Sequence, residues 1–305
     1  MYELDSLTVV LYGASYTRLY IEVLNRMKCL NCHEEIHEHL RYCLVCGADA
    51  GYPNVRAALR DEEVTALQSR VKEAEEDANL RACKRVLEEF RESISESSAV
   101  INCSLGRINE LLSSDNALYA SYYKAVGGEA RLPEDNEFDR IRQSIDTLLF
   151  PYYAENIRFG ALSIDRTGIS RYGNWSMVLK ESAIRDRATV FEENSIMFIK
   201  RHRIVPGDPI PLGCRATWTN RSALTTAKLT KRLASTTTRS EFPKLLADSN
   251  NTNPDFIEVH IYGPIHRRAI EHLSGPEPRH KADKVLHRSV GRKAKEIGAT
   301  MGISR

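Results

Sequence analysis

Four cysteines close to the N-terminus constrain this chain more than any other feature. They form two Cys-x-x-Cys pairs, Cys29/Cys32 and Cys43/Cys46, and ten residues separate the two pairs. This spacing lets both thiolates of one tight turn bind the same ion, and two such turns complete the tetrahedral set that Zn²⁺ prefers. Gly47 follows the second pair, where the turn favours a residue that tolerates positive φ. We therefore expect Cys29, Cys32, Cys43 and Cys46 to hold a structural Zn²⁺ ion. Four unlinked cysteines are the alternative.

The sequence around these cysteines also resembles a known class of small module. Residues 29–50, from Cys-Leu-Asn-Cys to Cys-Leu-Val-Cys-Gly-Ala, resemble the short zinc ribbons at the N-termini of many bacterial proteins. The resemblance implies a contact module for protein, DNA or RNA, and rarely a catalytic unit. His33, His37 and His39 lie inside this segment. Because four cysteines already fill the metal site, we expect these histidines to be exposed.

Length and overall charge leave several classes of protein open. A chain of 305 residues is long enough for two or three domains. It has 43 Lys and Arg against 41 Asp and Glu, so total charge alone does not indicate a protein that binds polyanions. No apolar run approaches the length of a membrane span, and the N-terminus lacks the pattern of a signal peptide. The remaining cysteines, Cys83, Cys103 and Cys214, are scattered. These features predict a cytoplasmic protein without a membrane partner.

Charge is distributed unevenly along the chain. Acidic residues are concentrated within 61–95, and basic residues within 200–245 and the last 27 positions. A basic C-terminal half fits an anionic partner such as RNA, DNA or a dinucleotide. A solvated surface balanced by the acidic helix is the alternative. The candidate nucleic-acid contacts lie at helical spacing within 217–234 and are Arg221, Lys228 and Arg232.

The pattern of apolar residues and breakers predicts an α+β chain in three parts. These are a zinc ribbon with flanking strands over 1–54, a helical section over 55–155 and a mixed α+β domain over 156–305. Residues 7–12 and 17–24 are expected as strands, or as a strand and a short helix. Helices are expected over 57–94, 99–112, 116–126, 135–150, 217–234, 242–246, 265–273 and 281–298. Strands are expected over 157–164, 175–179, 188–191, 196–200 and 256–262.

The strand expected over 256–262 is the first candidate for chemistry. Its alternation places Glu258, His260 and Tyr262 on one face, opposite three aliphatic residues. The carboxylate and the imidazole would start about 7 Å apart along the strand. A carboxylate at the head of a strand, beside a polar loop, suits the stabilisation of a positively charged transition state. An edge strand with one wet face would give the same pattern.

Two further stretches carry side chains that suit phosphate, ribose or a flat ring. An arginine can bind phosphate through paired N–H groups, a tyrosine can stack on a ring, and serine or asparagine can bind ribose or phosphate. Ordinary hairpin and turn residues are the alternative. The side chains of these types are Arg158, Arg171, Tyr172, Arg187, Asn194 and Ser195.

The run from 158 to 263 resembles a family of bacterial proteins of ADP-ribosyltransferase-like fold. The resemblance is carried by Tyr172-Gly173 before a strand, by Val178-Leu179-Lys180, by Arg187-Ala-Thr189 with Asn194-Ser195, and by Ile257-Glu258-Val259-His260-Ile261-Tyr262-Gly263. It covers about a third of the chain. The Ser-Thr-Ser strand of the arginine class and the His-Gly-Thr strand of the other class are not evident.

The resemblance implies chemistry on NAD as a substrate. Breaking the bond between nicotinamide and ribose makes the ribose oxocarbenium-like, and a nearby carboxylate stabilises that charge. Under this resemblance the catalytic residues are Glu258, Tyr172 and Arg187. The residues that bind NAD are Arg158, Tyr172 and Ser195, with an arginine on the pyrophosphate and the tyrosine ring on nicotinamide. The basic segments would then meet a nucleic-acid acceptor.

Three hypotheses for function follow. The first is an ADP-ribosyltransferase-like toxin or antiphage defence effector that modifies RNA, DNA or a protein, with a cognate antitoxin or chaperone as a possible partner. The second is a non-catalytic zinc-ribbon protein that binds nucleic acid and regulates. The third is a ribonuclease-type toxin that uses His260 with Glu258. The zincin, P-loop, dinucleotide-binding and nucleophile-elbow motifs are not found in the sequence.

Overall fold

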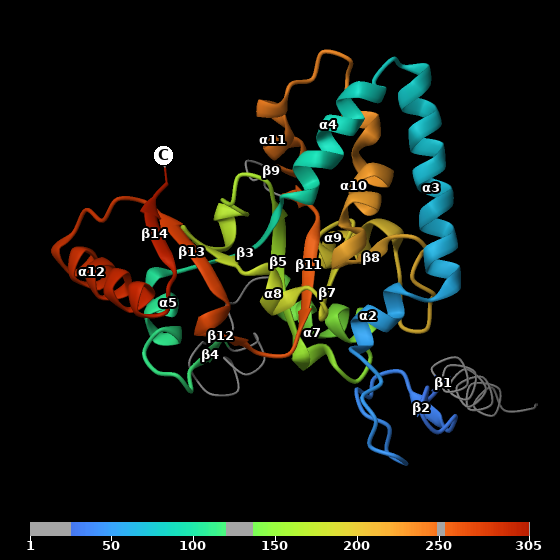
Figure 1. Cartoon of the computed structure of the whole chain (residues 1–305), viewed down its shortest axis with the longest axis horizontal. Coiled ribbons are helices and arrows are strands. Elements are labelled where there is room, and N and C mark those ends of the chain that lie inside the picture. The colour runs from blue at the N-terminus through green and yellow to red at the C-terminus, as the bar shows by residue number, and fades with distance from the viewer. Residues whose placement is uncertain (1–25, 120–136, 249–253, 305) are drawn as a thin grey trace, which may run out of the picture.

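A mixed eight-stranded sheet forms the centre of the protein (Figure 1). The computed structural model describes residues 26–119, 137–248 and 254–304, so the segments 7–12 and 17–24 lie outside the described residues. The strand order is β14-β13-β6-β3-β5-β11-β7-β8. Strands β13 and β14 are parallel, and every other neighbouring pair is antiparallel. The strands are β3 (Ser98–Cys103), β5 (Ile157–Ser163), β6 (Trp175–Leu179), β7 (Ala188–Phe191), β8 (Arg215–Thr217), β11 (Glu258–Tyr262), β13 (Ile270–Gly275) and β14 (Thr300–Ile303).

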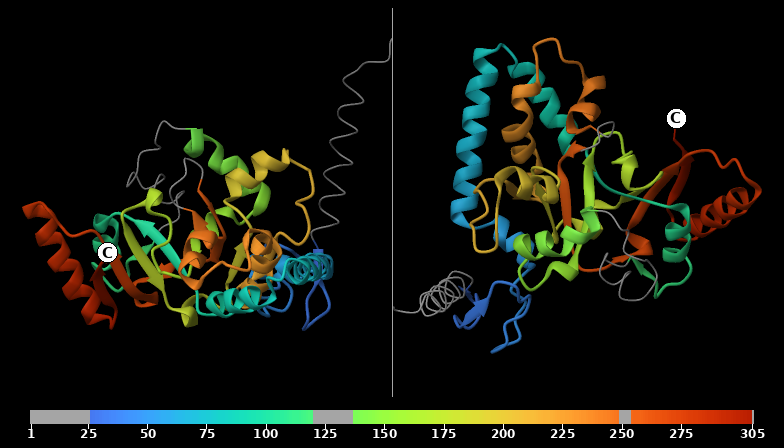
Figure 2. Two further views of the ribbon diagram at one scale, coloured as in Figure 1. Left: turned by 90° about the horizontal axis from the view of Figure 1, so that it is seen from above. Right: turned by 180° about the vertical axis from the view of Figure 1, so that it is seen from behind.

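Helices cover both faces of this sheet, which confirms a mixed α+β class (Figures 1 and 2). On the face of Ile257, Val259 and Ile261, the core continues into α3 (Asp61–Leu80), α4 (Lys84–Ser95), α5 (Leu105–Leu111), α10 (Arg221–Leu229) and α12 (Lys281–Glu296). The opposite face carries Glu258 and His260 and packs against α7 (Glu137–Leu149) and α9 (Ser195–His202). Shorter helices are α2 (Pro53–Ala58), α8 (Glu181–Ile184) and α11 (Phe242–Leu246).

Three two-stranded pairs lie outside the large sheet. β1 (Arg26–Lys28) pairs with β2 (Glu35–His37) beside the first cysteines, β4 (Leu118–Tyr119) with β12 (Ile265–His266), and β9 (Ala247–Asp248) with β10 (Asp255–Phe256). Among the described helices, none combines the length and the apolar character that crossing a bilayer requires.

The segment expected to be wholly helical supplies an inner strand of the sheet. Residues 98–103 form β3 between β6 and β5, where a helix over 99–112 was expected to begin. β3 includes the β-branched pair Val100 and Ile101, which suits a strand buried on both faces. The helix α5 starts only after Ser104, whose hydroxyl accepts a hydrogen bond from the backbone N–H of Arg107. The helix expected over 57–94 divides into α2, α3 and α4, and Ala82 adopts a left-handed φ of 54° between the last two.

Two other expected elements have the opposite type. The strand expected over 196–200 is the helix α9, because the side-chain oxygen of Asn194 accepts hydrogen bonds from the N–H groups of Ile196 and Met197 and caps a helix there. The helix expected over 265–273 is replaced by β12 and β13. The helix expected over 217–234 is α-helical only over 221–229. Of the helix expected over 116–126, residues 118–119 form a strand, and 120–126 lie outside the described residues. The remaining expected elements within the described residues are confirmed to within two residues for 157–164, 175–179, 188–191, 242–246, 281–298, 135–150 and 256–262.

The cysteine-rich segment is fixed to the sheet through α2. Asn54 is 3% exposed, and its side-chain amide donates to the carbonyl oxygens of Arg187, directly before β7 (3.1 Å), and of His260 on β11 (3.2 Å). Two residues later, Arg56 donates to the carbonyl oxygens of Leu40 (2.8 Å) and Ala50 (3.0 Å). The cysteine-rich segment is therefore linked by two side chains to the strand that carries Glu258.

Candidate functional site

The four cysteines meet, as their spacing predicts. Their Sγ atoms all lie within 4.8 Å of one another, with 3.6 Å between Cys29 and Cys46 and 3.6 Å between Cys32 and Cys43. Four thiolates at a Zn–S distance of about 2.3 Å stand about 3.8 Å apart in a tetrahedron. The donor atoms present therefore fit one Zn²⁺ ion, whose role would be to hold the ribbon together.

The two cysteine pairs sit on the same kind of turn. The N–H of His33 donates to the carbonyl oxygen of Cys29 (2.9 Å), and the N–H of Gly47 donates to that of Cys43 (2.8 Å). Both residues are left-handed, with φ of 61° at His33 and 73° at Gly47. Glycine adopts this conformation without cost, as expected at position 47, whereas a side chain there costs about 1 kcal/mol. His33 is exposed and does not replace a cysteine ligand.

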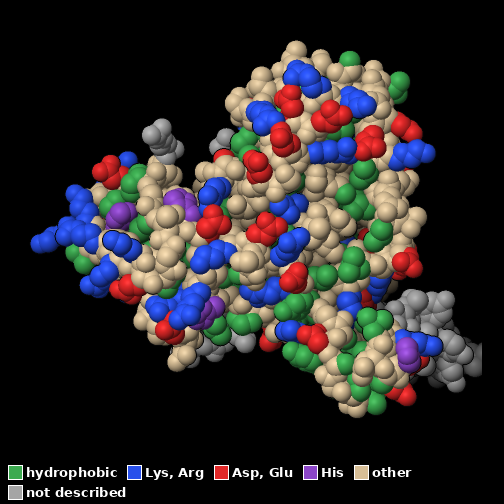
Figure 3. Space-filling view, in the orientation of Figure 1, with side chains coloured by type: hydrophobic (Ala, Val, Ile, Leu, Met, Phe, Trp, Pro, Cys, Tyr) green, Lys and Arg blue, Asp and Glu red, His purple; other side chains and the backbone are tan. Residues whose placement is uncertain are grey.

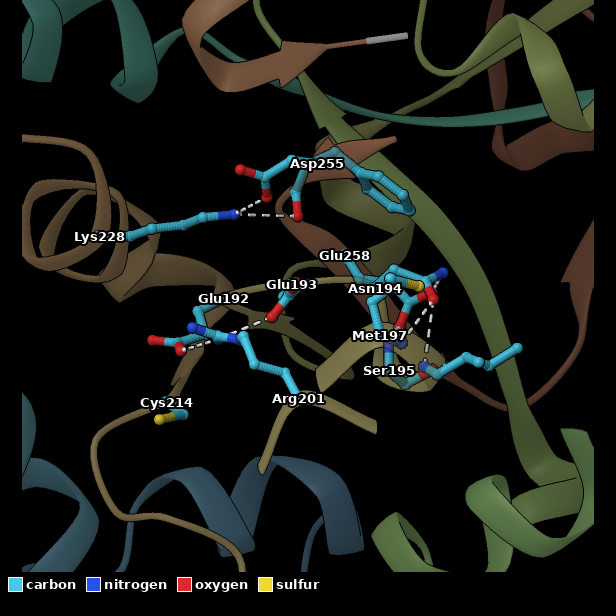
Figure 4. Close-up of polar contacts among 12 residues, drawn as sticks. Glu192, Glu193, Asn194, Ser195, Met197, Arg201, Cys214, Lys228, Asp255 and Glu258 are labelled. Atoms are coloured by element: carbon cyan, nitrogen blue, oxygen red, sulfur yellow. Dashed lines mark hydrogen bonds and ion pairs between the residues drawn. The ribbon is translucent and has the colours of Figure 1, made fainter. Parts of the chain in front are cut away.

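Glu258 occupies the first position of an inner strand, and its carboxylate is tied to the start of α9 (Figure 4). The residue is 3% exposed. Its Oε2 accepts a hydrogen bond from the backbone N–H of Ser195 (2.9 Å), and its Oε1 accepts one from the side-chain amide of Asn194 (3.3 Å). The two hydrogen bonds fix the carboxylate in place, and the N-terminus of α9 favours its negative charge. β11 pairs with β5 and β7 on its two sides, so the alternative of an edge strand is wrong.

Tyr172 joins the same group from a different part of the chain. Its hydroxyl accepts a hydrogen bond from the side-chain amide of Asn194 at 3.3 Å, and the residue remains 50% exposed. Burial of the hydroxyl and the negative charge of Glu258 raise the pKa of Tyr172 to about 12. The turn that presents Tyr172 depends on Gly173, where a Cβ would come within 2.4 Å of the backbone of Cys103. The structure thus brings Tyr172, Asn194 and Glu258 together, as a cluster with one solvent-facing ring.

His260 supports Glu258 from inside the protein. Its Nε2 lies 2.9 Å from Oε2 of Glu258, so the two side chains converge from neighbouring positions on one face of β11. The imidazole is 3% exposed and is surrounded by the rings of Phe150, Phe159 and Phe191, with centroids 4.9, 5.4 and 5.4 Å away. His260 can orient the carboxylate, and its surroundings separate it from solvent.

A guanidinium that the sequence analysis did not single out lies on this side of the sheet. Arg142 of α7 stands over the ring of Phe159, 4.1 Å from its centroid, and pairs with Asp146 through Nε at 3.3 Å from Oδ2. Its positive charge acts on the Tyr172 hydroxyl and opposes the upward shift of that pKa. In the sequence, Arg142 and Asp146 look like an ordinary ion pair one helical turn apart. Only the packing of Arg142 on Phe159, the cross-strand partner of His260, reveals that it lies on the Glu258 face of the sheet.

The two arginines expected to bind pyrophosphate do not lie beside Glu258. Arg158 pairs with Ile261 across the β5–β11 ladder and therefore points to the face opposite Glu258. It is 4% exposed and donates to the carbonyl oxygens of Glu155 (3.2 Å) and Tyr119 (3.5 Å). Burial, with a smaller effect of the nearby Arg187, lowers the pKa of Arg158 to about 10.

Arg187 and Ser195 also make contacts other than those expected. Arg187 donates to the carbonyl oxygens of Ala183 (2.8 Å), Tyr262 (2.6 Å) and Pro264 (2.9 Å), which join the ends of β7 and β11. Ser195 is fully buried, and its backbone N–H rather than its hydroxyl contacts Glu258. Its Oγ has no hydrogen-bond partner among the described residues.

The three basic residues expected to contact nucleic acid are engaged within the protein. Arg221 is 7% exposed, and its guanidinium donates to the carbonyl oxygen of Trp218 (3.1 Å) and to those of residues 94 and 95 at the end of α4. Lys228 binds Asp255 at 2.5 Å, and Arg232 pairs with the same carboxylate (Figure 4 shows the lysine pair). These residues do not form an exposed basic stripe on α10.

Comparison with known proteins adds no relative. No protein-family model matches the chain, and no curated protein matches its sequence. The zinc-binding geometry and the mixed α+β fold thus stand on the structure alone, and the ADP-ribosyltransferase-like fold has no support from a family match.

Proposed function

We propose that the Glu258 cluster is the catalytic centre of an ADP-ribosyltransferase-like enzyme that uses NAD as its substrate. One observation carries the proposal. The Glu258 carboxylate is held by the Ser195 N–H and the Asn194 amide, and the same amide contacts the half-exposed Tyr172. A fixed carboxylate beside an accessible aromatic ring suits a substrate that has a flat ring attached to a sugar that becomes positive.

The proposed reaction exchanges one bond at the ribose. The bond between C1′ and the nicotinamide nitrogen breaks, and its electron pair stays with nicotinamide. A nucleophilic oxygen or nitrogen of the acceptor forms the new bond to C1′ and releases its proton. Glu258 would stabilise the positive charge on the ribose, Tyr172 would stack on the nicotinamide ring, and Asn194 would keep both in register. We assign the pyrophosphate to Arg142 rather than to Arg158 or Arg187, because Arg142 acts electrostatically on the Tyr172 hydroxyl, whereas the other two donate to backbone carbonyl oxygens.

The surroundings of His260 favour this reaction over RNA cleavage. A ribonuclease that uses His260 as general acid or base needs the imidazole within hydrogen-bond reach of the substrate. The imidazole lies among three phenylalanine rings, whereas the equally buried Glu258 carboxylate contacts Asn194, whose amide also reaches the half-exposed Tyr172. Its contact with Glu258 instead suits a residue that positions the carboxylate.

The test follows label from NAD in two single variants. The protein is incubated with NAD labelled in the adenylate, together with oligonucleotides, total RNA and cell lysate, and free nicotinamide is measured in parallel. The wild type is expected to transfer label or to release nicotinamide. Glu258→Gln keeps the size of the side chain and the acceptor for the Ser195 N–H but loses the charge, so we expect at least about a hundredfold loss of rate.

The matched control is Glu271→Gln, which removes an exposed carboxylate from β13, where it pairs with Arg166. Its rate is expected to equal that of the wild type, and both variants should melt within about 2 °C of it. A wild type that neither releases nicotinamide nor transfers label, or a Glu258→Gln variant as active as Glu271→Gln, would contradict the proposal.

A further inference from the structure

One face of α12 carries basic side chains over its whole length. At 100° per residue, Lys281, Lys284, Arg288, Arg292 and Lys295 fall within an arc of about 80° on the helix. All five are exposed, and the buried residues Val290 and Ala294 lie on the opposite side of the helix. We call these five residues the α12 stripe. In Figure 3 its blue side chains gather at the left end of the molecule, where Figure 1 places α12.

The charges of the α12 stripe are not offset by an ion pair within the described part of the chain. Among the ion pairs of the described residues, none involves a member of the stripe. The two acidic residues of the helix, Asp283 and Glu296, lie outside the arc. This differs from α10, where Lys228 and Arg232 share Asp255 and Arg221 is buried. Helix α12 therefore carries five exposed cations on one face with no ion pair among the described residues.

The helix is also rigidly mounted. Val290 and Ala294 are fully buried in the core shared with α5 and the sheet. Away from the stripe, about 100° around the helix from its edge, the ammonium of Lys293 donates to the side-chain oxygen of Asn109 at 2.8 Å. From Lys281 to Lys295 the helix rises about 21 Å, and a DNA strand at duplex spacing places about six phosphates over that length.

We propose that the α12 stripe is a docking surface for the phosphate backbone of a nucleic acid. An anionic membrane would also attract five cations, but interfacial helices insert an apolar face into the bilayer. Val290 and Ala294 of α12 are buried in the core, and Val285 is the one large apolar side chain that the helix exposes, so charge dominates the surface that it offers to a partner. The stripe has no base-reading geometry of its own, and binding through it is expected to depend on salt and little on sequence.

This inference goes beyond the proposed reaction and does not depend on it, because it rests on α12 alone. If the reaction proposed for Glu258 takes place, nucleic acid bound at the stripe is either the acceptor of ADP-ribose or a bound molecule that determines which acceptor is modified. β14, next to α12, is separated from β11 by four strands, or about 24 Å across the sheet, so a docked chain must extend around the edge to reach Glu258.

The test measures binding by fluorescence anisotropy of a labelled 20-nucleotide oligothymidine and of a 20-base-pair duplex at 50, 100 and 200 mM NaCl. The stripe variant is Lys284→Gln/Arg288→Gln/Arg292→Gln. The control variant, Lys84→Gln/Lys231→Gln/Lys244→Gln, removes the same charge from exposed positions elsewhere. We expect the stripe variant to bind at least about tenfold more weakly than wild type at 100 mM NaCl, and the control to stay within about twofold.

The salt dependence gives a second readout. Loss of three phosphate contacts should lower the slope of log affinity against log salt by about 2 for the single strand and about 3 for the duplex. Arg288→Lys/Arg292→Lys keeps the charge and should retain binding. Glu258→Gln should bind as the wild type does, even if NAD chemistry fails. Equal losses in the stripe and control variants, no binding by the wild type at 50 mM NaCl, or binding only to phosphatidylserine vesicles would overturn the proposal.

Discussion

The carboxylate of Glu258 is held by two donors that come from adjacent residues, Asn194 and Ser195. Asn194 has three tasks at once. Its oxygen caps α9 through the N–H groups of Ile196 and Met197, while its amide donates to Glu258 and to the Tyr172 hydroxyl. One side chain thus links the start of a helix to both groups of the proposed catalytic centre.

Substitution of Asn194 separates its capping role from its role toward Glu258. Asn194→Ala removes both, and we expect it to lower the free energy of unfolding by about 1–2 kcal/mol in urea titration. Asn194→Ser can still cap α9 but lacks the amide that reaches Glu258 and Tyr172. It should therefore recover most of the stability but not the orientation of the Glu258 carboxylate and the Tyr172 hydroxyl. If both variants are as stable as the wild type, the cap assigned to Asn194 is wrong.

Asp255 gives the protein a predictable response to acid. Burial alone would raise the pKa of this carboxyl, but Lys228 and Arg232 outweigh it, so the pKa lies below its ordinary value of 3.8. Burial lowers the pKa of Lys228 despite its ion pair with Asp255, which limits the stability that the pair contributes. A carboxyl with a lowered pKa stabilises the fold above its unfolded pKa, and this contribution disappears as the pH falls through the folded pKa.

We therefore expect Asp255→Asn to be less stable than the wild type at pH 7, by about 2 kcal/mol, because Lys228 loses its partner. The two free energies of unfolding should converge as the pH falls below about 4. Asp186→Asn, at an exposed position, is the control and should follow the wild-type curve. A constant gap between wild type and Asp255→Asn from pH 7 to pH 3 would rule out this role for the pair.

At the scale of elements, local signals predicted some structures and missed others for identifiable reasons. Strands β6 and β7 were predicted residue by residue, because short apolar runs bounded by Gly, Lys and charged turns leave little choice. β3 was missed because Ile101, Leu105 and Ile108 also match helical spacing, and only pairing with β5 and β6 selects the strand. α9 was missed because its apolar run is short, and the capping by Asn194 decides its type.

The four-cysteine cluster is the part of the structure most fully predicted from sequence, because its geometry depends on four side chains at fixed spacing that could hold one metal ion. We expect one zinc per chain by elemental mass spectrometry, and a large loss in Cys43→Ser. Cys83→Ser changes a buried thiol outside the cluster and should keep its zinc. Removing the metal should unfold the 29–50 segment and expose it to protease. The hydrogen bonds from Arg56 to the carbonyl oxygens of Leu40 and Ala50 would be lost with the fold of the segment. Equal zinc in both variants would contradict this assignment.

At the scale of the whole molecule, segments distant in sequence meet at one strand. The ribbon reaches β11 through Asn54, the turn of Tyr172 reaches it through Asn194, and α7 brings Arg142 to the same face. Periodicity placed Glu258 on the right face of its strand. Arg158 points to the face opposite Glu258 because of the register between β5 and β11, and Arg187 contacts backbone carbonyls because of how the strand ends pack. The sequence reveals neither the register nor the packing.

The measurement that tests the central claim most directly is the steady-state rate of nicotinamide release by Glu258→Gln over a range of NAD concentrations. If Glu258 acts on the ribose in the transition state, kcat falls by at least about a hundredfold while KM and thermal stability stay near the wild-type values. A Glu258→Gln protein with wild-type kcat, or one that loses activity only because it no longer folds, would contradict the claim that this carboxylate performs chemistry.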